Sequence, residues 1–271
     1  MDTTPLNFPN TSPLHVSPAE VESWIVEEDA DYIVFNKPGN IVCHPSKNGP
    51  WSSLVGAVKE SRKMATLHLV SRLDRETSGI LIIAKNKNAA RTTQMAIEHR
   101  LVSKTYLALL RGEMPAPTLV DQAIGKDNTS PIAIKHRISH AENARSAVTF
   151  FEPLLVKNHY TLARITPHTG RTHQIRVHAQ WLGYPIAGDK LYGPDERLYL
   201  EFVENGWGPR HEATLELHRQ ALHAARLEFK THLFQRTFAA PLPEDMRKLC
   251  LEKIACTPND LATALALQPS P

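Results

Sequence analysis

The stretch Ser71-Arg72-Leu73-Asp74-Arg75-Glu76-Thr77-Ser78-Gly79-Ile80-Leu81-Ile82-Ile83-Ala84 decides how this chain is organised. Its second half is a short apolar run that predicts a buried strand. Thr77-Ser78-Gly79 is typical of a turn. We therefore expect Asp74 on a loop anchored by a rigid strand, where proteins tend to place chemical groups. These residues alone leave two interpretations open: Asp74 is a catalytic carboxylate, or it forms an ion pair with Arg72 or Arg75 on the surface.

A second stretch, residues 166–178, reads Thr-Pro-His-Thr-Gly-Arg-Thr-His-Gln-Ile-Arg-Val-His. It belongs to a span between Glu152 and Asp189 that contains no acidic residue. A basic segment without carboxylates predicts a surface that follows nucleic-acid phosphates.

The second stretch also predicts a helix, with Thr172 as its N-cap and Gly183 at its end. One face of this helix is expected to pack against the rest of the protein and carries Ile175, Ala179 and Leu182. The other face is expected to present cations and carries His173, Arg176 and Gln180. Zinc sites on a helix need histidines three or four residues apart. A spacing of five separates His173 from His178 around the helix, so no metal site is expected.

Arg72-Leu73-Asp74-Arg75-Glu76-Thr77-Ser78-Gly79-Ile80-Leu81 resembles the signature of the RluA-type pseudouridine synthases, whose aspartate is the essential catalytic residue. That family usually has His before Arg-Leu-Asp, where this chain has Ser71, a departure that concerns a supporting contact. Four further stretches resemble the family's motifs in the right order: Lys37-Pro38-Gly39-Asn40, Lys104-Thr105-Tyr106, Gly170 to Gly193, and Leu222-His223-Ala224 followed by Ala240-Pro241-Leu242-Pro243. The first departs from the family's Lys-Pro-x-Gly, because its glycine is displaced by one place.

The resemblance covers roughly residues 25–250. It implies an α+β fold: a mixed, mostly antiparallel sheet with flanking helices and a basic active-site cleft. It also implies an isomerase that converts uridines of ribosomal or transfer RNA to pseudouridine without a cofactor. The strand-rich pattern of the sequence, with few βαβ repeats, agrees with this fold class.

The resemblance assigns roles to the site residues. Asp74 is the catalytic carboxylate, acting as a nucleophile or as a base. Arg176 pairs with Asp74 and keeps it ionised. Tyr106 stacks on the uracil and can assist proton removal from carbon 5. Arg72 fills the gap left by the flipped nucleotide; the expected RNA contacts are Arg72, Arg75, Arg171 and His173.

The bulk composition is that of an ordinary globular protein. The chain has 271 residues, 42% of them hydrophobic and 22% charged, and a net charge of +3, which is compatible with an RNA partner. Its three cysteines form no CxxC pair, which favours reduced thiols and a cytoplasmic location. No apolar run approaches membrane-spanning length, and no signal peptide is recognisable. We expect a monomer.

The expected organisation is a flexible arm at residues 1–20, a catalytic domain at 21–255 and a tail at 256–271. Residues 113–145 are expected to form a peripheral sub-domain, and 194–215 an exposed irregular insertion. Two other functions are compatible with parts of the sequence. One is a non-catalytic RNA-binding protein that retains the synthase cleft. The other is a hydrolytic enzyme using Asp74 with the histidines, which lacks a second carboxylate or nucleophile at a recognisable spacing.

Overall fold

The computed structural model of the chain describes residues 15–44, 49–231 and 235–266. The strands are β1 (Ile25–Glu28), β2 (Tyr32–Lys37), β3 (His68–Leu69), β4 (Ser78–Ala84), β5 (Val102–Arg111), β6 (Thr118–Asp121), β7 (Ile124–Lys126), β8 (His136–Ile138), β9 (Val148–Lys157), β10 (Tyr160–Pro167), β11 (Leu222–Lys230) and β12 (Gln235–Ala239). The helices are α1 (Pro18–Ser23), α2 (Leu54–Arg62), α3 (Lys87–Glu98), α4 (Gln174–Trp181), α5 (Arg197–Asn205), α6 (Pro209–Thr214), α7 (Glu244–Lys253) and α8 (Pro258–Ala266), with a short 3-10 helix at Pro50–Ser52.

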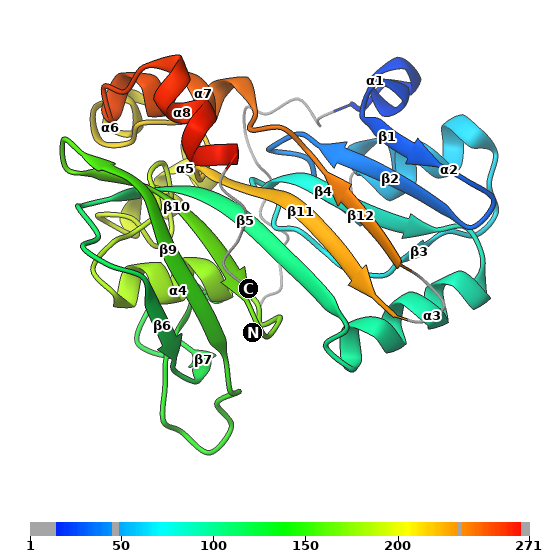
Figure 1. The fold of residues 1–271 in the computed structure, drawn as a ribbon, viewed down its shortest axis with the longest axis horizontal. Coiled ribbons are helices and arrows are strands. Elements are labelled where there is room, and N and C mark those ends of the chain that lie inside the picture. The colour runs from blue at the N-terminus through cyan, green and yellow to red at the C-terminus, as the bar shows by residue number, and fades with distance from the viewer. Residues whose placement is uncertain (1–14, 45–48, 232–234, 267–271) are drawn as a thin grey trace.

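One ten-stranded sheet forms the centre of the described part of the chain (Figure 1). Its strand order is β1-β2-β4-β11-β5-β10-β9-β6, with β12 paired to β11 and β3 paired to β4. Strands β4 and β11 are parallel, and the other pairs of this sheet are antiparallel. The predicted α+β class with a mixed, mostly antiparallel sheet is confirmed.

The N-terminal half of the sheet is covered on both faces, and apolar residues of β2 and β4 point to either side. Alternate residues point to opposite sides. Ile33, Phe35, Leu81 and Ile83 pack against α2, whereas Val34, Ile80 and Ile82 pack with residues of α3. Side-chain caps start both helices: Ser53 Oγ accepts from the Gly56 N–H at 3.1 Å and Asn86 Oδ1 from the Ala89 N–H at 2.9 Å.

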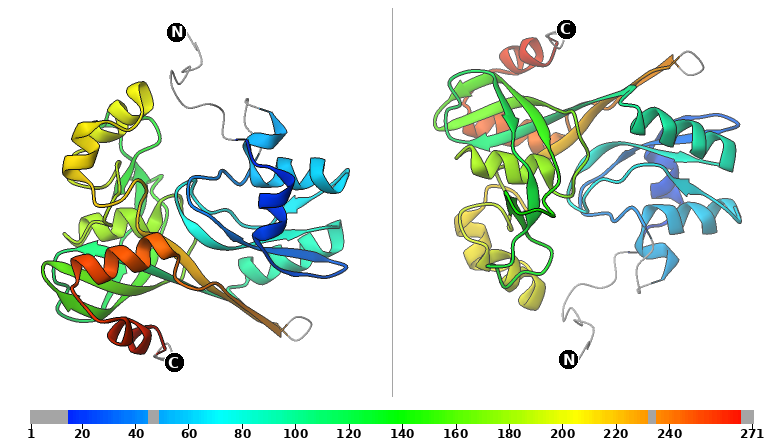
Figure 2. Two further views of the ribbon diagram at one scale, coloured as in Figure 1. Left: turned by 90° about the horizontal axis from the view of Figure 1, so that it is seen from above. Right: turned by 90° about the horizontal axis from the view of Figure 1, so that it is seen from below.

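The C-terminal half is built from the long strands β5, β10 and β9. Helix α4 packs on one face of these strands and α8 lies on the opposite face, as the two views of Figure 2 show. Ile175 and Ala179 of α4 join the same apolar cluster as Ala163 and Ile165 of β10, as predicted for that face of the helix.

The two halves meet where β11 lies between β4 and β5. Ala224 of β11 pairs with Gly79 on one side and with Tyr106 on the other. Gly79 has φ +112°, and a Cβ on it would stand 2.2 Å from the carbonyl oxygen of Ala224. Only glycine fits this close approach, which fixes the start of β4, and the loop before it, beside Tyr106.

Several sequence predictions about local structure were wrong. Residues 15–20 are ordered: Val16 is buried, and Ser17 and Glu20 form a capping box that starts α1. Residues 194–215 form α5 and α6 instead of an irregular insertion, and the tail contains α8. Helix α4 begins without a side-chain cap, because His173, and not Thr172, is its first flanking residue, with φ +56°. The remaining parts of the predicted arm and tail, 1–14 and 267–271, lie outside the described residues.

The segment 113–145 is peripheral, as predicted, but only part of it is separate from the main sheet. Strand β6 adds to the main sheet beside β9, whereas β7 and β8 form a two-stranded sheet of their own.

Candidate active site

The loop between β3 and β4 carries Asp74 and is held by buried donors from other segments. The ammonium of Lys37, which is fully buried, donates to the Arg75 carbonyl at 3.2 Å, and the Cys43 thiol donates to the Leu73 carbonyl at 3.3 Å. The guanidinium of Arg219 donates to the Glu76 carbonyl at 3.2 Å. The loop is therefore fixed by its backbone, which leaves the Asp74 side chain for chemistry.

Arg176 on α4 binds two carboxylates at once. Its Nη1 donates to Asp74 Oδ2 at 3.0 Å, while its Nε and Nη2 donate to the two oxygens of Asp189 at 2.7 and 2.9 Å. The predicted pairing of Arg176 with Asp74 is present in the structure. Asp74 pairs with neither Arg72 nor Arg75, so the surface ion pair left open by the sequence does not form among the described residues.

Asp189 is the residue that positions Arg176. Its side chain is fully buried, and Oδ1 also accepts the backbone N–H groups of Leu191 and Tyr192 at 2.9 Å each. Burial opposes its ionisation, but the charge and hydrogen bonds of Arg176 outweigh burial and lower the pKa of Asp189. The Tyr192 ring lies 4.8 Å from the guanidinium carbon of Arg176. The guanidinium is thus held on three sides by rigid groups.

Asp74 is ionised and has one oxygen available. Burial disfavours its charge, but Arg176, together with hydrogen bonds from Arg176 and Gln220, lowers the pKa of Asp74. Both of those hydrogen bonds reach Oδ2, the one from Gln220 being long at 3.5 Å. None of the described residues donates to Oδ1, and the side chain is 31% exposed. The second oxygen can therefore meet a ligand.

Tyr106 lies beside this carboxylate on β5. Burial, and then the negative charge of Asp74, raise the pKa of Tyr106. The phenol is consequently neutral at neutral pH. Its ring packs against the apolar cluster of the C-terminal half, with Ala224 and Ile165 as its neighbours on the adjacent strands.

The four expected RNA contacts differ in environment. Arg72 and Arg75 are exposed on the Asp74 loop, and Arg75 Nε donates to the Asn40 carbonyl at 3.3 Å. Arg171 donates through Nε to the Ser146 carbonyl at 2.9 Å. The prediction for His173 as a cation was wrong: burial and the nearby Arg176 lower the pKa of His173 to about 4, so it is neutral near pH 7.

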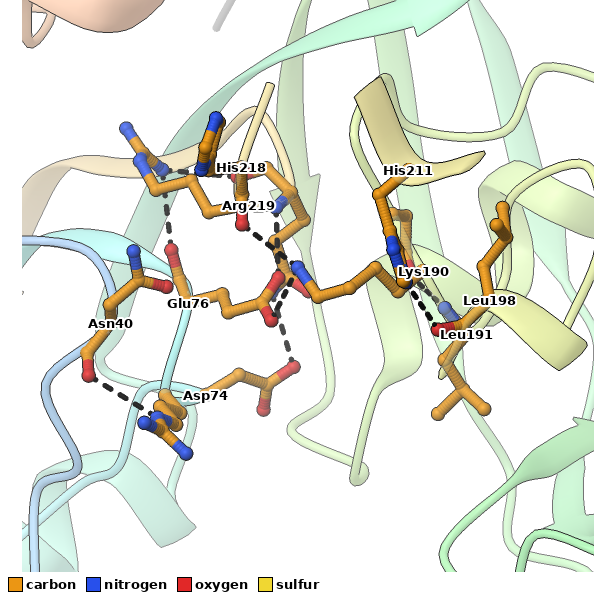
Figure 3. A network of polar contacts seen from close by, with 12 residues as sticks. Asn40, Asp74, Glu76, Lys190, Leu191, Leu198, His211, His218 and Arg219 are labelled. Carbon is orange, nitrogen blue, oxygen red and sulfur yellow. Dashed lines mark hydrogen bonds and ion pairs between the residues drawn. The ribbon is translucent and has the colours of Figure 1, made fainter. Parts of the chain in front are cut away.

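A second polar network lies beside Asp74 and includes Glu76 of the same loop. In Figure 3 the side chains of Asp74 and Glu76 point to the same side, toward Lys190. The Lys190 ammonium is 2.9 Å from Glu76 Oε1 and donates to the His218 carbonyl at 2.9 Å. It also lies 4.7 Å from the centre of the Phe202 ring of α5. Through Lys190, the segment with α5 and α6 is joined to the Asp74 loop.

Sequence reasoning missed three residues of this site: Asp189, Gln220 and Lys190. Asp189 could have been noticed as the acid that ends the carboxylate-free span. No local signal marked Gln220, whose amide donates to Thr77 Oγ1 at 2.6 Å across the β4–β11 junction. Within the described ranges no group of His, Cys, Asp and Glu side chains could hold a metal ion, and His173 and His178 have separate partners. In the same part of the chain, none of the helices has the length and apolarity of a membrane span.

Comparisons with known proteins place this geometry in context. Residues 31–181 match the model of the RNA pseudouridylate synthase family. The chain is 36% identical over 232 residues to the uncharacterized RNA pseudouridine synthase YjbO of Bacillus subtilis (strain 168), covering 83% of this chain and 74% of that protein. It is 32% identical over 233 residues to the ribosomal large subunit pseudouridine synthase D of Vibrio cholerae, covering 84% and 69%. The solved structure of human RNA pseudouridylate synthase domain containing 1 superposes with a TM-score of 0.68 at 26% identity, covering 97% of this chain and 99% of that one.

Proposed function

Because the chain belongs to the RluA-type RNA pseudouridine synthases, we propose that Asp74 is its catalytic carboxylate and that its substrate is large-subunit ribosomal RNA. The protein is an isomerase: the bond between N1 of uracil and C1′ of ribose breaks, a bond between C5 and C1′ forms, the hydrogen leaves C5 and N1 gains a proton. The substrate part of the proposal is supported by relatives that are named as ribosomal large subunit synthases.

The ionised state and free oxygen of Asp74 carry the catalytic assignment. A nucleophile or a general base must be deprotonated and must have an oxygen that the protein does not occupy. Arg176 and Gln220 hold Oδ2, so Oδ1 is the atom that meets the flipped nucleotide. Arg176 cannot lose its proton at any pH that RNA tolerates, and Asp189 prevents it from turning away.

Tyr106 is assigned to stacking on the flipped uracil. Its neighbours on both sides belong to rigid strands, so the ring offers a fixed platform. Its raised pKa keeps the phenol neutral. Removal of the C5 proton is therefore not assigned to an ionised Tyr106.

RNA binding by exposed cations completes the proposal. Arg72 and Arg75 are exposed on the loop that carries Asp74. By its resemblance to the family, Arg72 is assigned to fill the space that the flipped nucleotide vacates. Arg171 supplies a phosphate contact. His173 is assigned a neutral contact because it lacks a charge near pH 7. A protein that only bound RNA would need these cations, but not an ionised carboxylate fixed by a buried arginine.

Tritium release tests the substrate class. Ribosomal and transfer RNA would be isolated separately from cells that lack this protein and were labelled with tritium at C5 of uridine. Purified protein should release tritium from the large-subunit ribosomal fraction and not from the transfer RNA fraction. Release from transfer RNA alone would contradict the proposed substrate while leaving the assignment of Asp74 intact.

A further inference from the structure

Lys104 lies on the face of β5 that carries Tyr106, the residue next to Asp74. The two residues are separated by two positions on a strand whose side chains alternate, so they point to the same side. β5 and β10 are antiparallel with Tyr106 opposite Ile165. Lys104 is therefore level with Pro167, the last residue of β10, where the loop that carries Arg171 begins.

The half-buried Lys104 has no anionic partner. None of the described residues ion-pairs or hydrogen-bonds with its ammonium, and burial lowers its pKa. The two other buried lysines near Asp74 are fully satisfied: Lys37 donates to three carbonyl oxygens, and Lys190 pairs with Glu76. Proteins normally pair charges that they remove from water. The missing partner of Lys104 is thus expected to be a ligand.

Three arginines form a group of cations on the segments that precede β5 and β9 and follow β10. Arg171 donates through Nε to the carbonyl of Ser146, and Ser146 directly follows the exposed Arg145. Arg100 is exposed in the turn between α3 and β5, four residues before Lys104, at the end of β5 that Figure 1 shows near α3. Burial and the charges of Arg145 and Arg100 lower the pKa of Arg171, so the three cations are neighbours. Their side chains form no ion pair within the described part of the chain.

We propose that Lys104 binds the RNA phosphate next to the flipped uridine and that Arg171, Arg100 and Arg145 bind the phosphates that follow. An ammonium suits this task because it acts as a point charge toward phosphate oxygens. Lys104 is two positions along β5 from Tyr106, so its phosphate contact would lie close to the reacting nucleotide. This inference rests on the proposed placement of the uridine between Asp74 and Tyr106.

The salt dependence of RNA affinity tests the inference. The proteins are the wild type, Lys104→Met, Lys104→Arg and, as a matched control, Lys248→Met on helix α7, where the lysine side chain is 74% exposed. The probe is large-subunit ribosomal RNA from cells lacking the protein, and filter binding gives Kd between about 50 and 400 mM KCl. Loss of one phosphate contact should reduce the slope of log Kd against log salt by about 0.7.

Lys104→Met should show this smaller slope and a Kd raised several-fold at low salt. Lys104→Arg should keep most of the slope, and Lys248→Met should match the wild type. Single-turnover tritium release by Lys104→Met should need a higher enzyme concentration to reach its maximum, and this loss of affinity should exceed any fall in the maximal rate, because the contact positions RNA and does not touch the reacting atoms. Thermal unfolding should show no loss of stability, since an unpaired charge is removed.

Two results would overturn the inference. An unchanged salt slope for Lys104→Met means that Lys104 binds no phosphate. A large fall in the saturated rate with an unchanged slope means that Lys104 acts on the reacting nucleotide itself. A failure of the proposed catalytic role is distinguishable, because the binding slopes are measured without turnover.

Discussion

Replacement of the fully buried Asp189 by Asn should strongly lower the free energy of unfolding. The Asn oxygen can keep the bonds from Leu191 and Tyr192, but its amide nitrogen then faces Nε of Arg176, donor against donor. Removal of one partner from a buried ion pair costs about 3–5 kcal/mol. For a chain of this size that corresponds to a fall in Tm of roughly 6–20 °C.

Two matched variants isolate the effect of burial. Asp245→Asn also removes a charge that binds an arginine through both oxygens, at 2.7 and 2.9 Å, but the Asp245 side chain is 40% exposed. Asp74→Asn removes the charge of the other carboxylate that binds Arg176. The Asp74 side chain is 31% exposed, and this variant leaves the pair of Arg176 with Asp189 intact. Each of these two carboxylates keeps part of its side chain in water, so both variants should lose clearly less stability than Asp189→Asn.

Urea unfolding followed by circular dichroism, with thermal scans, measures all three variants. The expected order of lost stability is Asp189→Asn far ahead of Asp245→Asn and Asp74→Asn. Asp189→Asn should also lower kcat, because Arg176 can then turn away from Asp74. Equal losses in the three variants, or an Asp189→Asn protein as stable as the wild type, would refute the reasoning from burial.

Three further predictions concern buried groups of the two polar networks and of strand β11. Gln220→Glu places a like charge beside Asp74 Oδ2, so the acid limb of the pH profile of kcat should move to higher pH; the pH profile of tritium release measures this, and an unmoved limb would exclude the contact. His223 is fully buried and its pKa is lowered to about 4, so the unfolded chain binds its proton first, and stability should fall from pH 6.5 to 4 by roughly 3 kcal/mol. His223→Gln should flatten that fall in urea midpoints measured across this range, although His173 contributes to the same window. Lys190→Met should lower the free energy of unfolding by about 2 kcal/mol or more. In a double-mutant cycle with Glu76→Gln, the coupling energy should exceed about 0.5 kcal/mol; if the two single effects simply add, Lys190 and Glu76 do not interact.

The core of the fold was predictable because its signals are local. The apolar run after Gly79 is the buried strand β4, as predicted. Helix α5 was not predicted because the segment 194–215 is rich in charged residues. Leu198 and Phe202 nevertheless stand at helical spacing, and Leu198 is fully buried. The prolines of the N-terminal segment suggested an extended arm, so neither the capping of α1 nor the burial of Val16 was predicted.

The site was predictable only in part. Asp74, Arg176 and Tyr106 stand in motifs that resemble a known family, and the structure brings these residues together. Asp189 and Gln220 become part of the site through contacts between distant segments, which spacing does not reveal. The charge of His173 depends on burial beside Arg176, so a count of cations along the helix overestimated the positive surface.

The most direct test of the account compares wild type with Asp74→Asn in single-turnover tritium release from C5-labelled ribosomal RNA. Filter binding on the same preparations shows that both proteins are saturated with RNA. We expect release by the wild type and a rate lower by about a thousandfold or more for the variant, with similar RNA affinity. An Asp74→Asn protein that releases tritium at nearly the wild-type rate would contradict the central role of this carboxylate.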